Sequence, residues 1–394
     1  MVYADNAATT KMSRTAIDAM LPYMETHYGN PSSLYRLGQE AAEALQSARE
    51  TVAACLGCTP REITFTSGGS EADNQALISA ARIGERKGKK HIISTAFEHH
   101  AILHTLKKLE KEGFEVELLP VGPTGTITAQ QVADAIRPDT CLVTILYANT
   151  EIGSILPIAE IGAVCREKGV LFHTDAVQAA GHLHINVNEQ NIDMLSLSGH
   201  KFHGPKGTGV LYARQGIPLT NIIEGGAQER GKRAGTENVP GIMGLAAALK
   251  EACDHIDENT AKVSALRDQL IAGLSQIPHS ALNGDPVHRL PGNVNFCFEG
   301  IEGESLLLLL DQAGICASSG SACTSGSLDP SHVLLAIGRP HEVAHGSLRL
   351  SLCEWNTQED VDHILKEVPR IVAYLRSISP VWKDLTSGKK QFML

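Results

Sequence analysis

Short apolar runs alternate with helix-forming stretches through the first two thirds of this chain, and that alternation constrains its fold more than any other feature. The runs rich in β-forming residues are 62–66, 91–95, 116–120, 141–149, 170–175, 194–198 and 209–213. Alternation at this spacing is typical of a mostly parallel sheet with helices on both faces. The run 141–149 is apolar without a period of two, so we expect it inside the sheet. The sequence therefore predicts an α/β domain with a mostly parallel, seven-stranded sheet.

The pattern changes after Pro240, which indicates a second domain. A long helical region covers 242–277, interrupted near 254–259. It is followed by strand candidates 293–298 and 347–352 and by helix candidates 304–313 and 357–378, the last capped by Asn356 or Thr357. One hydrophobic core stops growing near about 250 to 300 residues, so we expect about two domains. We assign 15–257 to a large domain, and 1–14 with 258–394 to a smaller α+β domain.

Charge and hydropathy exclude several classes of partner. Lys and Arg total 34 against 44 for Asp and Glu, a net charge of −10, which argues against nucleic acid and anionic membranes. The longest apolar run, 306–310, is far shorter than the roughly 20 residues of a bilayer-spanning helix. The first ten residues lack the charged start and apolar core of a secretory signal, so we expect a cytoplasmic protein.

The cysteines do not form a disulfide framework. There are 9 in 394 residues, an odd and sparse set that a reducing compartment keeps as thiols. Cys55 and Cys58 form a CxxC without a second pair, and we interpret both as structural rather than as metal ligands.

Polar signals follow the predicted strands, where ligands bind in open α/β sheets. After the run 62–66 comes the small-residue turn 67–74, which leads into a helix. Its glycines expose backbone N–H groups, and a helix N-terminus favours an anion, so the turn fits a phosphate. A plain strand-to-helix turn with Ser67 as the cap explains the same residues equally well.

Histidines follow the next strand. His100 and His104 stand four residues apart, as metal ligands on a helix do, but no third ligand has suitable spacing. A flat imidazole from the group His99, His100 and His104, placed against a planar cofactor, is the better interpretation.

Asp175 and Lys201 each follow a predicted strand, and together with the phosphate turn and the histidines they indicate pyridoxal phosphate. A carboxylate at such a position needs a cationic partner, which is either an arginine or a protonated pyridine nitrogen. Pyridoxal-phosphate enzymes pair an Asp with the ring nitrogen and a Lys with the aldehyde. Lys201 suits that role better than Lys206, which lies in a Gly-Pro-Lys-Gly turn.

Two further candidates lie in the C-terminal third. The stretch 316–327 consists of small polar residues, so we expect a loop, extending to about 330, on which Cys323 is placed to react. A linker with an incidental cysteine is the alternative. Arg349 lies in a predicted strand, where bidentate hydrogen bonding to a carboxylate would explain its position.

These motifs resemble the cysteine desulfurases of the iron–sulphur-cluster and nitrogen-fixation type. That family belongs to the class V aminotransferases, which are pyridoxal-phosphate enzymes of fold type I. The resemblance runs along nearly the whole chain, through 3–10, 29–33, 225–238, 321–332 and 344–349, and it is closest to the nitrogen-fixation branch.

The resemblance implies a role for each cofactor residue. Lys201 would bond to the cofactor aldehyde, His99 would stack on the ring, and Asp175 would pair with the ring nitrogen. Gln178 would hydrogen-bond the ring oxygen. The phosphate would be held by Gly69, Ser70, Ser198, His200 and, from the other subunit of a homodimer, Thr236. The family usually has Thr where Ser70 stands, and the serine keeps the hydroxyl.

The resemblance also implies the reaction. Asn149 and Arg349 would bind the carboxylate of L-cysteine, and Cys323 would accept its sulphur as a persulfide while alanine leaves. The partner would be an iron–sulphur scaffold or another sulphur-acceptor protein. No resident metal is expected, apart from transient iron–sulphur ligation by Cys323 with a scaffold. The alternatives are a selenocysteine lyase, another class V transaminase or lyase, and an inactive scaffold protein.

Overall fold

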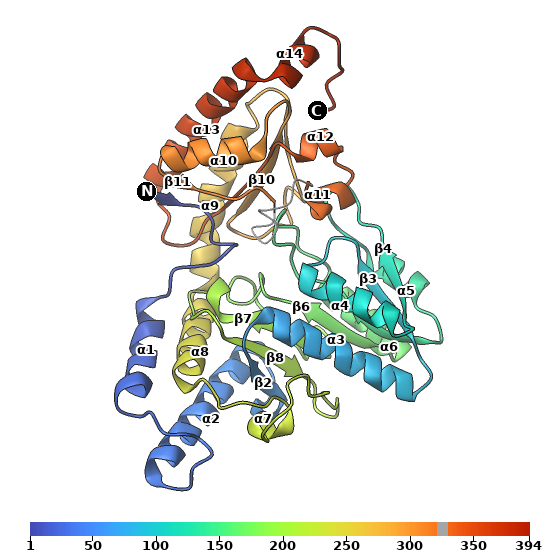
Figure 1. The fold of residues 1–394 in the computed structure, drawn as a ribbon, viewed down its shortest axis with the longest axis vertical. Helices are drawn as coiled ribbons and strands as arrows, with labels where there is room; N and C mark the ends of the chain where they lie inside the picture. Colours follow the sequence, from blue (N-terminus) through green and yellow to red (C-terminus); the bar gives the residue numbers. More distant parts are fainter. Residues whose placement is uncertain (321–329) are drawn as a thin grey trace.

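A seven-stranded sheet forms the centre of the larger part of the molecule (Figure 1). The computed structural model describes residues 1–320 and 330–394. The strand order is β2-β8-β7-β6-β5-β3-β4, and β8 alone runs antiparallel to its neighbours. The strands are β2 (Ile63–Thr66), β3 (His91–Thr95), β4 (Glu115–Leu119), β5 (Thr140–Thr144), β6 (Leu171–Asp175), β7 (Met194–Ser198) and β8 (Gly209–Ala213). The predicted mostly parallel sheet is confirmed, with the run 141–149 in its interior.

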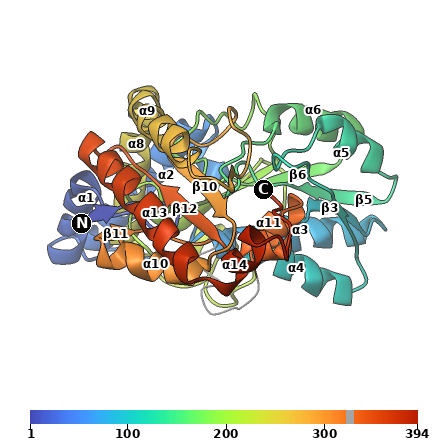
Figure 2. The same cartoon turned by 90° about the horizontal axis from the view of Figure 1, so that it is seen from above.

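Helices cover both faces of this sheet (Figure 2). One face carries α3 (Gly69–Arg86) and α4 (His100–Lys111), and the other carries α5 (Ala129–Ala135) and α6 (Ile158–Lys168). Every residue of β2, β3, β5, β7 and β8 is buried, and none of them is Asp, Glu, Lys or Arg, as expected for strands covered on both faces.

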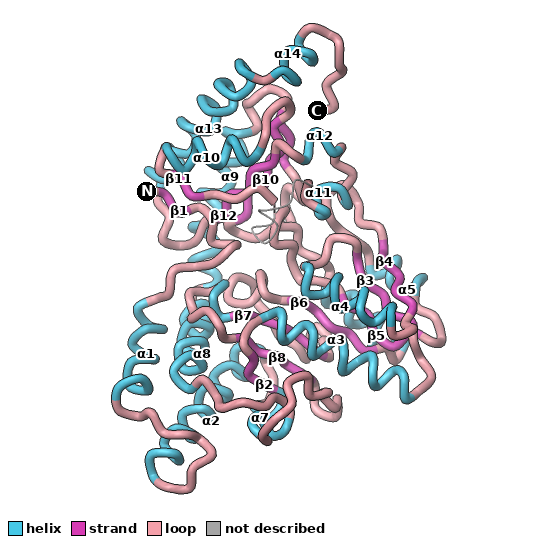
Figure 3. The backbone as a smooth tube through the Cα atoms, viewed as in Figure 1, coloured by secondary structure: helices cyan, strands magenta, loops and turns pink. Residues whose placement is uncertain are grey.

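The smaller part is built around a three-stranded antiparallel sheet of order β12-β10-β9 (Figure 3). Its strands are β9 (Ser280–Leu282), β10 (Asn293–Phe298) and β12 (Ser347–Ser351). Helices α9 (Ile256–Leu274), α10 (Gly303–Gln312) and α13 (Gln358–Ile378) pack around it, and Thr357 caps α13 as one of the two predicted candidates. The predicted interruption at 254–259 is wrong in extent, because α8 (Val239–Asp254) and α9 are separated by His255 alone.

The N-terminal segment joins the two parts. β1 (Val2–Tyr3) pairs in parallel with β11 (Ile315–Cys316), and Val2 and Ala4 belong to the hydrophobic core of the smaller part. That contact favours the assignment of 1–14 to the small domain, while the domain limits stay a prediction. The remaining helices are α1 (Arg14–Glu25), α2 (Arg36–Leu56), η1 (Pro60–Glu62), η2 (Gly199–Lys201), α7 (Gln228–Gly231), α11 (His332–Ala336), α12 (His341–Ala344) and α14 (Pro380–Thr386).

Within 1–320 and 330–394, no helix combines the length and apolar composition needed to cross a bilayer.

Candidate active site

One cavity of about 220 Å³ gathers nearly all the predicted site residues. It lies beyond the carboxyl ends of β3, β5, β6 and β7, as expected for an open α/β sheet. The predicted residues that line it are Gly69, Ser70, His99, Asn149, Asp175, Gln178, Ser198, His200, Lys201 and Arg349.

Two predicted residues are not among those lining the cavity. Cys323 lies outside the described residues. Thr236 is exposed and away from the cavity of its own chain, so its predicted role requires a second subunit.

Lys201 lies in η2, directly after β7. Its Nζ donates hydrogen bonds to the carbonyl oxygens of Ala7 at 2.5 Å and Ala8 at 2.9 Å. The N-terminal segment therefore forms one wall of the cavity and holds the amine of Lys201 against that wall. Lys206 is exposed, in agreement with the choice of Lys201.

Asp175 ends β6 and is buried. Its Oδ1 accepts a hydrogen bond from the Val177 N–H at 2.9 Å. Burial raises the pKa of the carboxyl, while His99 and Lys201 lower it. No ion pair among the described residues joins Asp175 to an arginine, so the arginine alternative is wrong.

A second carboxyl stands beside Asp175. Asp73 on α3 is 1% exposed, its Oδ1 has no hydrogen-bond partner among the described residues, and burial together with Asp175 raises its pKa well above the ordinary range. Two buried carboxyls side by side are costly unless a positive group meets them. A protonated ring nitrogen at Asp175 would supply that charge.

The start of α3 has the form of an anion site. Gly68 has a φ of 155°, and a Cβ on Gly69 would lie 2.6 Å from Val177 Cγ2, so a side chain at either position would be strained. Ser70 and Ser198 line the same end of the cavity. Ser67 does not cap the helix, because its N–H and hydroxyl both bond to Glu71, so that part of the alternative is wrong.

His200 completes the anion site. Its Nδ1 lies 3.1 Å from Thr9 Oγ1. Burial, and then Lys201, lower the pKa of His200 to about 4, so the ring is neutral at pH 7.

The two side chains predicted to contact the ring, His99 and Gln178, line this cavity. His99 is the N-cap of α4, and its Nδ1 accepts the Ala101 N–H at 3.1 Å, which leaves the proton of a neutral ring on Nε2. Gln178 donates both of its amide hydrogens, to Ala7 O and Thr150 Oγ1. A bond from Gln178 to the ring oxygen would therefore need one of these hydrogens to be released.

Arg349 and Asn149 also line the cavity. Arg349 is 1% exposed, Nη2 lies 3.1 Å from Asp5 Oδ1, and Nε has no hydrogen-bond partner among the described residues. Asn149 accepts two backbone N–H groups at Oδ1 and gives one amide hydrogen to Phe97 O, so one hydrogen remains. Both side chains can still donate to a carboxylate.

The sequence reasoning assigned no role to several residues that line the cavity. Burial raises the pKa of Glu98 to about 8. Glu151 is buried and accepts the Ser331 hydroxyl, and His332 Nε2 lies 2.9 Å from Glu98 O. Glu98 directly precedes His99 in the sequence, but a residue type alone does not reveal that its carboxyl is buried.

The predicted histidine pair is not part of a metal centre. His100 and His104 have ring centroids 5.2 Å apart, but neither belongs to a group of three potential ligands in the described part of the chain. Burial lowers the pKa of His100 to about 4, and His332 stands 4.7 Å from its ring.

The donor set fits pyridoxal phosphate. The anion site, the buried carboxyl pair and the amine of Lys201 lie around one cavity, and they match the phosphate, the ring nitrogen and the aldehyde of that cofactor. Arg349 is then left for the carboxylate of an amino-acid substrate.

Comparisons with known proteins agree with this chemistry. Residues 2–364 match the class-V aminotransferase family. The chain is 52% identical to a cysteine desulfurase IscS of Clostridium botulinum, covering 99% of both chains, and 54% identical to a cysteine desulfurase IscS of Methanosarcina thermophila, covering 96% of this chain and 94% of that protein. A solved NifS-like protein superposes with a TM-score of 0.89 at 38% identity, covering 95% of this chain and 100% of the other.

These likenesses confirm the predicted resemblance, fold type I and the cofactor. The chain belongs to the class-V aminotransferase family of pyridoxal-phosphate enzymes.

Proposed function

We propose that this chain is a cysteine desulfurase. It converts L-cysteine to L-alanine, leaves the sulphur as a persulfide on Cys323, and donates it for iron–sulphur cluster assembly. The observation that carries the proposal is the meeting of Lys201, Asp175 and Arg349 around one cavity. The two relatives named cysteine desulfurase IscS, at 52% and 54% identity, support the choice of substrate.

The chain's own residues divide the work of binding. Ser70, Ser198 and His200 would hold the phosphate, and His99 would pack on the ring. Asp175 would keep the ring nitrogen protonated, because a buried carboxylate is stabilised by a cation beside it. Arg349 and Asn149 would hold the substrate carboxylate and so orient its Cα toward Lys201.

The same residues would then move a proton and the sulphur. Bound pyridoxal phosphate supplies an electron sink for the electron pair released at the substrate Cα. Lys201 Nζ would remove the Cα proton. The Cys323 thiolate would attack the substrate sulphur and form an S–S bond, while the C–S bond breaks and its electron pair stays with the carbon. That carbon takes a proton, Lys201 returns a proton to Cα, and alanine leaves.

Mass spectrometry of the holoenzyme after brief incubation with L-cysteine and no reductant tests this proposal. The expected result is one added sulphur on the Cys323 peptide and one alanine released per chain. The Cys323→Ala variant should release no alanine. A selenocysteine lyase or transaminase would still turn over as Cys323→Ala, and an inactive scaffold would give no product even with the native cysteine.

We further propose that the enzyme is a cytoplasmic homodimer that passes sulphur to a scaffold or another acceptor protein. None of the eight cysteines in the described residues forms a disulfide, and persulfide transfer needs a compartment that keeps thiols reduced. The exposure of Thr236, together with large exposed side chains such as Met24, Tyr28 and Leu34, supports a second subunit.

A further inference from the structure

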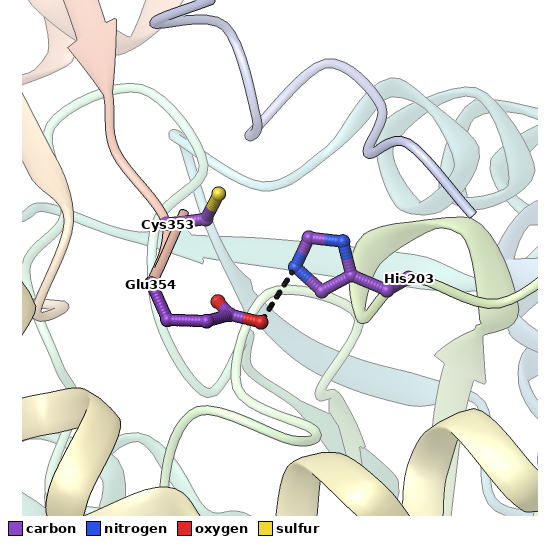
Figure 4. A group of neighbouring side chains, drawn as sticks. All are labelled: His203, Cys353 and Glu354. Atoms are coloured by element: carbon purple, nitrogen blue, oxygen red, sulfur yellow. Dashed lines mark ion pairs between the residues drawn. The ribbon is translucent and has the colours of Figure 1, made fainter. Parts of the chain in front are cut away.

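A second cluster of reactive side chains lies outside the cavity (Figure 4). His203 follows Lys201 by two residues, and Cys353 and Glu354 follow β12. One nitrogen of His203, the sulphur of Cys353 and one carboxylate oxygen of Glu354 all lie within 4.8 Å of one another. His203 is 5% exposed and Cys353 is 7% exposed. The cluster therefore joins the loop of the larger part that carries Lys201 to the strand of the smaller part that carries Arg349.

The hydrogen bonds of His203 fix which nitrogen faces the cluster. Nδ1 lies 2.8 Å from the carbonyl oxygen of Lys11. A carbonyl only accepts, so Nδ1 carries a proton, and in the neutral ring Nε2 holds the lone pair. Nε2 has no hydrogen-bond partner among the described residues, and it lies 3.2 Å from Glu354 Oε1.

The backbone and a neighbouring ring hold His203 in this orientation. Its φ is 65°, a conformation that is uncommon for residues other than glycine, and its N–H donates to Thr10 Oγ1 at 2.8 Å. The Trp355 ring lies 4.1 Å from the imidazole, centroid to centroid. Histidines that ligate metals characteristically donate their other N–H to a carbonyl or carboxylate, as His203 does to Lys11.

We propose that His203, Cys353 and Glu354 bind one Zn²⁺ ion, with water as the fourth ligand. An imidazole nitrogen, a thiolate and a carboxylate oxygen are the donors that zinc takes in proteins. The water would face the adjoining cavity of about 210 Å³, which His203, Glu354, Glu251 and His255 line. Binding releases the proton of the Cys353 thiol, and no group is oxidised or reduced.

The ion would fasten the two parts of the molecule together beside the active site. This goes beyond the proposed function and does not depend on it, and it departs from the expectation of no resident metal. The competing interpretation is a metal-free ion pair between protonated His203 and Glu354: burial lowers the pKa of His203, but hydrogen bonds with Cys353 and Glu354 raise it to about 10. The two interpretations differ in whether the sulphur binds a metal ion.

Zinc binding by the full-length holoenzyme tests the proposal, with Cys323→Ala as the background so that this thiol does not compete. After a chelator is removed by dialysis, equilibrium dialysis against ZnCl₂ should give one zinc per chain. X-ray absorption should show one sulphur at about 2.3 Å and nitrogen or oxygen ligands at about 2.0 to 2.2 Å. Added zinc should raise the melting temperature.

Three variants decide the outcome. Cys353→Ser should remove the sulphur signal, and Glu354→Gln, at a side chain 26% exposed, should weaken zinc binding by more than about tenfold. Cys58→Ser, at a half-buried cysteine outside the cluster, should bind zinc like the background protein. Glu354→Gln preserves the side-chain shape, so it remains informative if Cys353→Ser fails to fold. Absence of bound zinc in the background protein would overturn the proposal, as would unchanged zinc binding in both cluster variants.

Discussion

Arg349 lines the cavity and is buried, and only part of its guanidinium is occupied, by Asp5 and Thr150. A planar guanidinium can hold a carboxylate with two parallel hydrogen bonds, which the ammonium of lysine cannot.

We expect Arg349→Lys to raise the KM for L-cysteine by about tenfold or more, because a hydrogen bond to a charged group contributes about 1.5 to 3 kcal/mol. The fall in kcat should be smaller. Steady-state kinetics measure both constants, and Arg137→Lys on the surface is the control. An unchanged KM would remove Arg349 from the carboxylate site.

Glu98 should make the stability of the protein depend on pH. Burial raises its pKa from 4.5 to about 8 in the folded state. A carboxyl with a raised folded pKa contributes stability that is fully present below its unfolded pKa and is lost as pH rises through the folded pKa. The contribution of Glu98 is therefore lost between about pH 4.5 and about pH 8.

Glu98→Gln should remove this dependence. The variant should gain melting temperature relative to the parent as pH rises across that window, since an amide does not ionise. Calorimetry across this pH window measures the difference in melting temperature between variant and parent. Glu110→Gln is the control, because it removes the same charge at an exposed position of α4. A constant difference between variant and parent at every pH would show that Glu98 is already ionised in the folded protein.

At the scale of elements, one residue both begins a helix and faces the cavity. His99 caps α4 through Nδ1, so its roles in stability and in catalysis can be separated by substitution. Asparagine is among the best N-cap residues, whereas replacing a cap by alanine costs typically about 1 kcal/mol.

We expect His99→Asn to retain most of the folding stability and His99→Ala to lose about 1 kcal/mol. Both variants should lose activity, because neither has a ring to pack on the cofactor. Urea unfolding and alanine release measure the two effects. His104→Ala, on the same helix but outside the cavity, should keep activity. An active His99→Asn enzyme would mean that the ring itself is not required.

The elements that the sequence predicted well are the strands whose residues are all buried. The runs 91–95, 194–198 and 209–213 match β3, β7 and β8, because strands whose residues are all buried exclude Asp, Glu, Lys and Arg. The run 141–149 extends past β5, which ends at Thr144, because the chain beyond it still bonds β6 through the Ile145 and Tyr147 N–H groups. β1 and β11 have two residues each, too few for any period to appear.

The site was predictable to the extent that its chemistry lies in side chains at strand ends. Asp175 and Lys201 could be found in that way, and the family resemblance supplied most other roles. The carbonyls of Ala7 and Ala8 that hold Lys201 could not, because every residue type has a backbone carbonyl. The zinc cluster joins His203 to residues that follow β12, a proximity that no local pattern contains.

At the scale of the whole molecule, the position of Thr236 makes the proposed dimer testable by mixing subunits. If Thr236 acts across the interface, a heterodimer of one Lys201→Ala chain and one Thr236→Ala chain contains one site with both native residues. If Thr236 acts within its own chain, every site in that heterodimer lacks one of them.

We expect the mixed dimer to regain high affinity for pyridoxal phosphate at one site per dimer, above the affinity of either homodimer. Differently tagged chains allow the heterodimer to be purified, and cofactor titration followed by its absorbance measures the affinity. A heterodimer of Lys201→Ala with native chain is the positive control. Affinity no better than that of the Thr236→Ala homodimer would place Thr236 in its own chain's site.

The N-terminal wall of the cavity has a consequence for biosynthesis. The Ala7 N–H donates a hydrogen bond to Ser351 Oγ, 344 positions later in the sequence, and β1 pairs with β11. During translation these early residues leave the ribosome long before the strands that hold them exist. The residues of the wall behind Lys201 are therefore synthesised first but reach their folded position last. Loading of pyridoxal phosphate should therefore be a late event, and a ribosome-bound chain stalled before β11 should not retain the cofactor.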